Sequence, residues 1–396
     1  MKPLAGVRIT DFTVHAAGPF CTHLLAQLGA ECIKIESRLR PDIFRKPHPV
    51  YGRTEPSTFD QVSAGKLSVR LNLKHPKGAE LARALAAISD VAVENFRAGV
   101  MARLGLDWAG LSAANPRLVM VSVSSSGQVS PDSRFAGYAP LFGAWGGLGT
   151  LSGYADGPPM EVRHMMDHAA GLNGAFAVLA GLHGRARHGQ GAYFDVAARD
   201  VACASIGEYL LQAASGVAPE RWGNAHPGMA PHGVYATAGG DAWVAVAVRE
   251  DQEFQALCAL IGRADLAAEP RYASAAGRCA DRARLDVALE AWTSTQNAEA
   301  AAQALQGVGV AAHVSWNPQA IVDDPHLRAR GTIVDFAMPD GGTRAVIGAP
   351  MRFSNAEAGI ERGTPKLGEH EDYVFGELLK LSREERSLLE QQEVIA

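Results

Sequence analysis

The chain has 396 residues, of which 47% are apolar and 20% charged, and its formal net charge is −5. This length is too great for one simple core, so we expect two domains, or one large domain with an insertion. The negative charge and the lack of any run of five basic residues argue against a nucleic-acid partner. The five cysteines are widely scattered and form no C-x-x-C pair, which predicts neither a disulfide framework nor a cysteine zinc site.

Nothing in the sequence predicts a membrane partner. Residues 1–10 lack the apolar core of a signal peptide, and they lead directly into a strand pattern. The longest nearly uncharged run, 169–182, is shorter than the roughly 20 residues that a membrane-spanning helix needs. We therefore expect a cytoplasmic protein.

The first third of the chain alternates between strand and helix patterns. The pattern predicts helices at 20–28 and 77–88, and strands at 6–12, 31–36, 67–73, 90–94 and 118–123. Such alternation is typical of an α/β fold with a parallel sheet that helices cover on both faces. The turn after the first strand has no G-x-G-x-x-G sequence, so NAD binding is not expected.

A central segment, 161–182, begins with carboxylates and continues with small and apolar residues. This composition predicts a helix that is buried on all sides. Asp167 lies near its start, where unpaired N–H groups and a partial positive charge would hold a carboxylate ionised and fixed in direction. Such a placement suits a nucleophile. The alternative is a helix N-cap, for which Asp is among the preferred residues.

The remainder of the chain predicts a second, smaller α/β domain and a return to the first. A strand at 191–197 and a helix at 198–214 precede a linker at 216–228, which is rich in Gly and Pro and has no periodicity. A hairpin, a strand and alanine-rich helices then predict the small domain over 229–323. A hairpin at 332–347 and an amphipathic segment at 369–392 follow. We therefore expect a large domain that combines 1–215 with 324–396.

Eight ordered stretches of the chain resemble one family. They are 4–12 with 17–20, 28–36, 94–105, 115–118, 156–159, 189–191, 348–350 and 367–370. Together they resemble the family III CoA transferases, which include formyl-CoA transferase and carnitine CoA-transferase and have α-methylacyl-CoA racemase as a relative of the same fold. The resemblance implies a Rossmann-like large domain, an interlocked homodimer, and a coenzyme A thioester as substrate with no tightly bound cofactor.

The resemblance also implies a mechanism, because Asp167 matches the nucleophile of the family's transferases. There the aspartate attacks the acyl-CoA thioester to give a mixed anhydride and CoA thiolate, which then forms an aspartyl-CoA thioester. A carboxylate suits this reaction because the anhydride is about as reactive as a thioester. The chain would thus move CoA from an acyl-CoA donor to a small carboxylic acid acceptor.

The resemblance places CoA contacts at nine further positions. Arginines would pair with phosphate, and a phenylalanine would give an apolar wall. The positions are His15, Ala16, Arg38, Lys66, Asn95, Phe96, Arg97, Arg103 and Tyr138. For each charged residue, a role as a solvated surface charge is the alternative. Ala16 departs from formyl-CoA transferase, which has a polar amide at this position.

Three other interpretations remain open. A racemase or epimerase would need a base where this chain has Tyr138, and an unperturbed pKa near 10 makes tyrosine a poor base at neutral pH. A non-catalytic CoA-binding paralogue would have lost the nucleophile, whereas Asp167 is present.

His164 and His168, at helical i, i+4 spacing, could ligate a metal, but no third ligand stands at a recognised offset, so we expect no metal site. Arg163 would favour dicarboxylic substrates, unless it is a surface charge.

Overall fold

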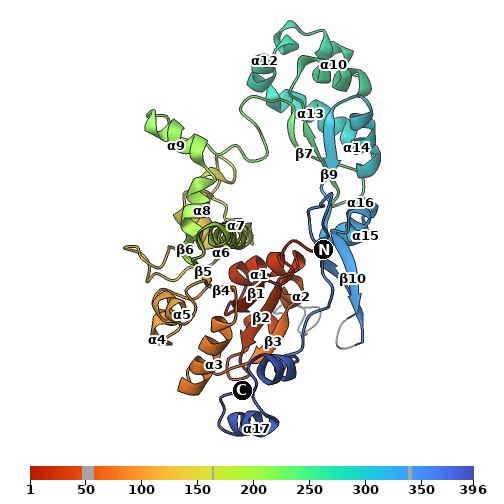
Figure 1. Ribbon diagram of the computed structural model, residues 1–396. Coiled ribbons are helices and arrows are strands. Elements are labelled where there is room, and N and C mark those ends of the chain that lie inside the picture. Colours follow the sequence, from red (N-terminus) through yellow and green to blue (C-terminus); the bar gives the residue numbers. More distant parts are fainter. Residues whose placement is uncertain (47–57, 163–164, 338–340) are drawn as a thin grey trace. The chain divides into compact units, whose positions relative to one another are not determined.

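The computed structural model describes residues 1–46, 58–162, 165–337 and 341–396, and the chain divides into two compact units (Figure 1). The first unit comprises Met1–Gly149, Glu161–Leu211 and Pro325–Ala396. The second comprises Thr150–Met160 and Gln212–Asp324. Among the described residues, no helix combines the length and the hydrophobicity that a membrane span requires.

A six-stranded parallel sheet forms the centre of the first unit, with the order β3-β2-β1-β4-β5-β6 (Figure 1). Its strands are β1 (Arg8–Asp11), β2 (Glu31–Glu36), β3 (Leu67–Arg70), β4 (Val91–Glu94), β5 (Val119–Ser124) and β6 (Ala192–Ala197). This sheet confirms the predicted α/β class and the predicted parallel pairing. The order is that of a doubly wound fold, in which the chain changes direction between β1 and β4.

Helices cover both faces of this sheet. One core cluster joins the sheet to α1 (Ala17–Gln27), α7 (Met165–His188) and α8 (Ala198–Ala204). The other joins it to α3 (Pro76–Ala87), α4 (Val100–Arg103), α5 (Trp108–Ala114) and two C-terminal elements, the π-helix Asp372–Leu378 and α17 (Arg383–Gln391). Val394 and Ile395 are buried in the second cluster, so both chain ends contribute to the same core.

Shorter elements complete the first unit. They are the 3-10 helix Ile43–Arg45, α2 (Thr58–Ser63), α6 (Ala139–Trp145), α16 (Pro325–Arg330) and the antiparallel strands β10 (Ile333–Ala337) and β11 (Thr343–Ile347). Helix α9 (Gly207–Ala214) begins in the first unit and ends in the second. The helix that we predicted at 198–214 is therefore two helices, since the backbone turns at Ser205 and Ile206 between α8 and α9. Residues 338–340 of the hairpin that we predicted at 332–347 lie outside the described residues.

In the single chain, the central helix is not buried on all sides as we predicted. Helix α7 buries a face of small residues, but Leu172 is 55% and Phe176 is 70% exposed in the single chain. The small residues let the helix approach its neighbours closely, and they leave the large apolar side chains on the opposite face.

The second unit contains an antiparallel sheet with the order β7-β8-β9. Its elements are β7 (His232–Ala236), β8 (Trp243–Ala247), α10 (Asp251–Leu260), α11 (Ala264–Ala267), the 3-10 helix Pro270–Ala273, α12 (Ala275–Ala280), α13 (Arg282–Thr293), α14 (Ala298–Gly307), β9 (Ala311–Val314) and α15 (Pro318–Asp323). A further 3-10 helix, Gly149–Leu151, lies where the two units join along the chain. The apolar residues of this sheet and its helices form a core of their own.

Candidate active site

The carboxyl ends of β1 and β4 form the switch point of the sheet, which is where ligands bind in open α/β folds. The Asn95 side chain joins the two loops that leave these strands. Its Oδ1 accepts the Val14 N–H at 2.8 Å, and its Nδ2 donates to the Val14 carbonyl at 2.7 Å. The predicted CoA contact Asn95 therefore clamps the loop after β1 to the loop after β4.

Asp11, at the end of β1, holds the start of the same loop in place. Its buried carboxylate accepts the Thr13 N–H at 2.8 Å and the Thr22 hydroxyl at 2.6 Å, and it lies 3.1 Å from Lys66 Nζ. Burial alone would raise the pKa of Asp11, but the Lys66 and Lys34 ammonium groups and these hydrogen bonds outweigh burial and lower the pKa. Asp11 is thus an ionised anchor in the core.

The Lys66 ammonium group is fully buried and is engaged by the protein itself. Its three protons have three acceptors, the Asp11 carboxylate, the Pro19 carbonyl at 2.9 Å and the Thr22 hydroxyl at 2.7 Å. No donor is left for a phosphate. Lys66, which the resemblance placed at CoA, is here a core ion-pair partner, and we do not include it in the candidate site.

His15 and Ala16 occupy the turn between β1 and α1. His15 is exposed and has a left-handed backbone (φ 64°), and its N–H donates to the Asp42 carboxylate at 3.2 Å. Ala16 is the N-cap of α1 and offers no side-chain oxygen to the first N–H groups of the helix. Those groups therefore face the switch point without a side-chain cap, in an arrangement that favours an anion.

Close packing of α1 against α7 brings Asp167 to this turn. A Cβ on Gly171 would lie 2.5 Å from the Ala17 carbonyl oxygen, so the two helix backbones are nearly in contact there. One turn earlier on α7, the His168 ring meets the Phe20 ring edge to face at 4.5 Å. Asp167 precedes Gly171 by four residues, so it lies on the helix face that meets α1.

Asp167 itself is half-buried in the first turn of α7. It follows two helical residues, Met165 and Met166, and therefore lies beyond the N-cap position. The interpretation of Asp167 as an N-cap is thus wrong, whereas its expected place near the helix start, where the helix dipole favours a negative charge, is confirmed.

Glu94, at the end of β4, is a site residue that the sequence did not indicate. It is 1% exposed, and its carboxylate accepts the Phe96 N–H at 2.7 Å and the Gln128 amide at 3.3 Å. Burial raises the pKa of Glu94 to about 7, although hydrogen bonds from Ser122 and Phe96 oppose that shift. Glu94 and Asp11 are both acidic residues at the end of a strand, and this shared position is the only feature of the sequence that could have indicated Glu94.

The remaining predicted CoA contacts are three arginines and two aromatic residues. Arg97 and Arg103 are exposed in and after the loop that follows β4, and Arg38 is exposed after β2. Within the described residues, none of the three guanidinium groups forms an ion pair or a side-chain hydrogen bond. Phe96 is half-buried against the second core cluster. Tyr138 is 65% exposed at the start of α6, which packs on α7.

The histidine pair proposed as a metal site cannot be assembled from the described residues, because His164 lies outside them, as does Arg163. In the part of the chain that is described, no three His, Cys, Asp or Glu side chains are grouped as metal ligands would be. All five cysteines are free thiols.

Comparison with known proteins identifies the family of the chain. A sequence model of CoA-transferase family III matches residues 4–371. The chain is 33% identical to succinyl-CoA--D-citramalate CoA-transferase of Chloroflexus aurantiacus, over 100% of this chain and 98% of that protein. It is 32% identical to succinate--glutarate CoA-transferase of Agrobacterium fabrum, over 96% and 97%.

A solved structure of a CAIB/BAIF family protein from Brucella suis is similar throughout, with a TM-score of 0.86 and 32% identity. The similarity covers 95% of this chain and 99% of that one. The sequence and the fold thus match the same group over nearly the whole length of the chain. The chain belongs to CoA-transferase family III and is a CoA-transferase.

Proposed function

We propose that Asp167 carries the transfer as a covalent nucleophile. Its carboxylate attacks the thioester carbonyl of the donor and expels CoA thiolate, which leaves an aspartyl-acyl anhydride. The thiolate attacks the aspartyl carbonyl of this anhydride, which releases the donor's free acid and gives an aspartyl-CoA thioester. The acceptor carboxylate then displaces the thiolate to form a second anhydride. Attack of the thiolate on its acyl carbonyl gives the new acyl-CoA and frees Asp167.

The observation that carries this proposal is the contact between α1 and α7. It brings a half-buried carboxylate to the start of one helix, beside the uncapped N–H groups at the start of another. Two helix N-termini stabilise negative charge, so they support both the ionised Asp167 and the oxyanion that forms as it attacks.

The open arginines suit the nucleotide end of CoA. Arg97 and Arg103 lie after β4 and Arg38 lies after β2, and each presents a guanidinium group that no carboxylate neutralises within the described residues. Guanidinium groups bind phosphate through paired hydrogen bonds. We infer that these arginines bind the CoA phosphates, while Phe96, His15 and Ala16 line the path toward Asp167.

We further infer that the donor is succinyl-CoA and that the acceptor is a small dicarboxylic acid. Two relatives are named for succinyl-CoA or succinate together with D-citramalate or glutarate. The test is a panel of acyl-CoA donors against mono- and dicarboxylic acceptors. Equal kcat/KM for acetate and for dicarboxylates would contradict this substrate class.

The covalent step is tested by trapping. Incubation with succinyl-CoA and hydroxylamine should convert Asp167 to a hydroxamate, which mass spectrometry locates on its peptide. Asp167→Asn should reduce kcat by at least about a thousandfold, as loss of a nucleophile does. Asp200→Asn is the matched control, because Asp200 is also in the first turn of a helix but is exposed on α8, which follows the outermost strand β6, and it should keep full activity.

The same experiment separates transfer from the alternative activities. A racemase would exchange the α-proton of a 2-methylacyl-CoA with deuterium oxide and would give no hydroxamate. A CoA-binding paralogue would bind CoA and do neither. Full activity in a folded Asp167→Asn variant would overturn the proposed mechanism.

We also propose a homodimer, interlocked as the family resemblance implies. The face of α7 that carries Leu172, Phe176 and Leu179 is apolar and exposed in the single chain, and exposed apolar patches of this kind mark interfaces. Light scattering should give a mass of roughly twice 41.8 kDa. Phe176→Glu should shift the protein toward monomer, and a fully active monomeric parent would contradict the dimer.

A further inference from the structure

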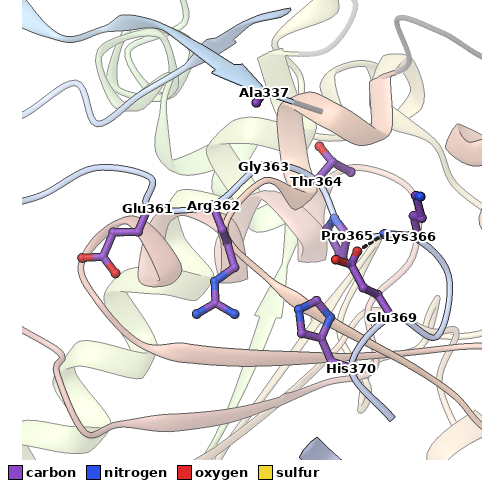
Figure 2. A pocket seen from close by; sticks show the side chains of 9 residues that line it. All are labelled: Ala337, Glu361, Arg362, Gly363, Thr364, Pro365, Lys366, Glu369 and His370. Atoms are coloured by element: carbon purple, nitrogen blue, oxygen red, sulfur yellow. Dashed lines mark hydrogen bonds between the residues drawn. The ribbon is translucent and has the colours of Figure 1, made fainter. Parts of the chain in front are cut away.

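A polar cavity of about 730 Å³ lies in the first unit, and none of the residues that line it belongs to the candidate active site (Figure 2). It is lined by the C-terminal segment that runs beside the outer edge of β3, together with one residue of β10. The lining residues are Ala337, Glu361, Arg362, Gly363, Thr364, Pro365, Lys366, Glu369 and His370. The backbone fixes this segment, because Gly65 N–H donates to Gly363 O and His370 N–H donates to Ser68 O.

The cavity presents hydrogen-bond donors that the protein does not use. Arg362 and Lys366 are exposed, and within the described residues neither side chain has a hydrogen bond or an ion pair. The Thr364 hydroxyl is buried and has no partner among the described residues. Figure 2 shows the Arg362 guanidinium group and the His370 ring pointing into the same space.

His370 contributes a further donor. Its Nδ1 accepts the Ser68 N–H at 3.3 Å, so the neutral ring carries its proton on Nε2. Burial lowers the pKa of His370, the nearby Glu369 carboxylate raises it, and the Arg362 charge lowers it further. Arg362 and His370 therefore repel each other when both are charged, and an anion between them would remove that repulsion.

The carboxylates at the cavity are already engaged. Glu361 lies 3.1 Å from Lys2 Nζ, and Glu369 accepts the Lys366 backbone N–H at 2.6 Å. The groups left open to a ligand are two cations and an imidazole N–H. Such a donor set matches a phosphate group, whose oxygens are strong acceptors.

We propose that this cavity binds a small molecule that carries a phosphate monoester, at a site separate from the one that binds CoA for catalysis. Its volume exceeds that of phosphate alone and is in the range of small-molecule sites. Arg362 holds the phosphate through its planar guanidinium group, the His370 imidazole N–H donates to it, and the Lys366 ammonium group adds positive charge at the cavity.

The test measures the His370 ring signals by NMR in protein labelled with [13Cε1]-histidine, with inorganic phosphate as the probe and no acyl-CoA present. The His370→Gln variant identifies the signals. Phosphate should shift them saturably and raise the pKa of His370. Arg362→Gln should raise that pKa without phosphate and weaken phosphate binding at least about tenfold.

Arg383→Gln is the matched control, because Arg383 is an exposed arginine on α17 outside the cavity, and it should leave phosphate binding unchanged. The Asp167→Asn variant should bind phosphate as the parent does, so this result does not depend on the proposed catalytic mechanism. The lack of a saturable shift, or equal binding in Arg362→Gln, would overturn the proposal. Loss of the phosphate shift on saturation with desulfo-CoA would show that the cavity belongs to the CoA site, and would also overturn it.

Discussion

Replacing Gly171 by alanine tests whether the approach of α7 to α1 positions the nucleophile. The new Cβ would lie 2.5 Å from the Ala17 carbonyl oxygen, whereas ordinary contacts begin near 3.4 Å. The obstacle is backbone, which cannot rotate away as a side chain would. The two helix starts must therefore separate locally by about 0.9 Å, the difference between these two distances.

That separation should affect both stability and catalysis. Overpacking of this kind costs about 1–3 kcal/mol of unfolding free energy. A displacement near 1 Å between a reacting group and its surroundings can lower the rate about a hundredfold. We expect Gly171→Ala to lose about 1–3 kcal/mol in urea unfolding, and kcat to fall by about one to two orders of magnitude with a smaller change in KM.

Gly184→Ala is the control on the same helix. Nothing lies within 4 Å of a Cβ at Gly184, and alanine is the better helix former by up to about 1 kcal/mol. This variant should be as active as the parent and equally stable or slightly more stable. If Gly171→Ala behaved like Gly184→Ala in both assays, the close helix contact would not be what holds Asp167 in place.

Substitutions at three positions, Lys66, Asp11 and Glu94, test the buried charges at the switch point. Lys66→Met should cost about 3–5 kcal/mol of unfolding free energy because it leaves Asp11 charged in the core. The double variant Asp11→Asn, Lys66→Met should recover part of that loss. A Lys66→Met variant as stable as the parent would contradict the importance of the ion pair. The pKa of Glu94 is about 7 when folded against 4.5 when unfolded, so the parent should lose up to about 3 kcal/mol of stability as pH rises through this window. Glu94→Gln should lack that loss in urea unfolding at pH 5 and pH 8, and identical pH dependence of both proteins would refute this origin.

The fold was largely predictable because its signals are local. Short apolar runs bounded by turns gave the six strands of the sheet, and their alternation with helices gave the parallel pairing. The place of Asp167 near a helix start was also predictable, since polar residues precede a long run without charge. The exposure of Leu172 and Phe176 could not be predicted, because it depends on which face of α7 packs against the rest of the protein.

The candidate site was predictable only in part, because a residue type does not show where its hydrogen bonds go. Lys66 and Arg97 look alike in sequence, as single cations beside predicted strands. In the structure Lys66 is enclosed by Asp11, Pro19 and Thr22, whereas Arg97 is exposed. What separates them is burial, which is set by contacts between residues far apart in the chain.

The polar residues at the switch point thus form two groups: those whose side chains hydrogen-bond to the protein itself, and those whose side chains are exposed. Asp11, Glu94 and Asn95 bond to the protein's own loops, and buried polar groups are costly unless they are paired in this way. Their bonds hold the loops after β1 and β4 in one conformation, which is how Arg97 and Arg103 can face a ligand without rearranging first. Substitution in the first group should therefore change stability and the binding of every CoA ester alike, whereas substitution of the two arginines should weaken CoA binding in a salt-dependent way and leave stability unchanged.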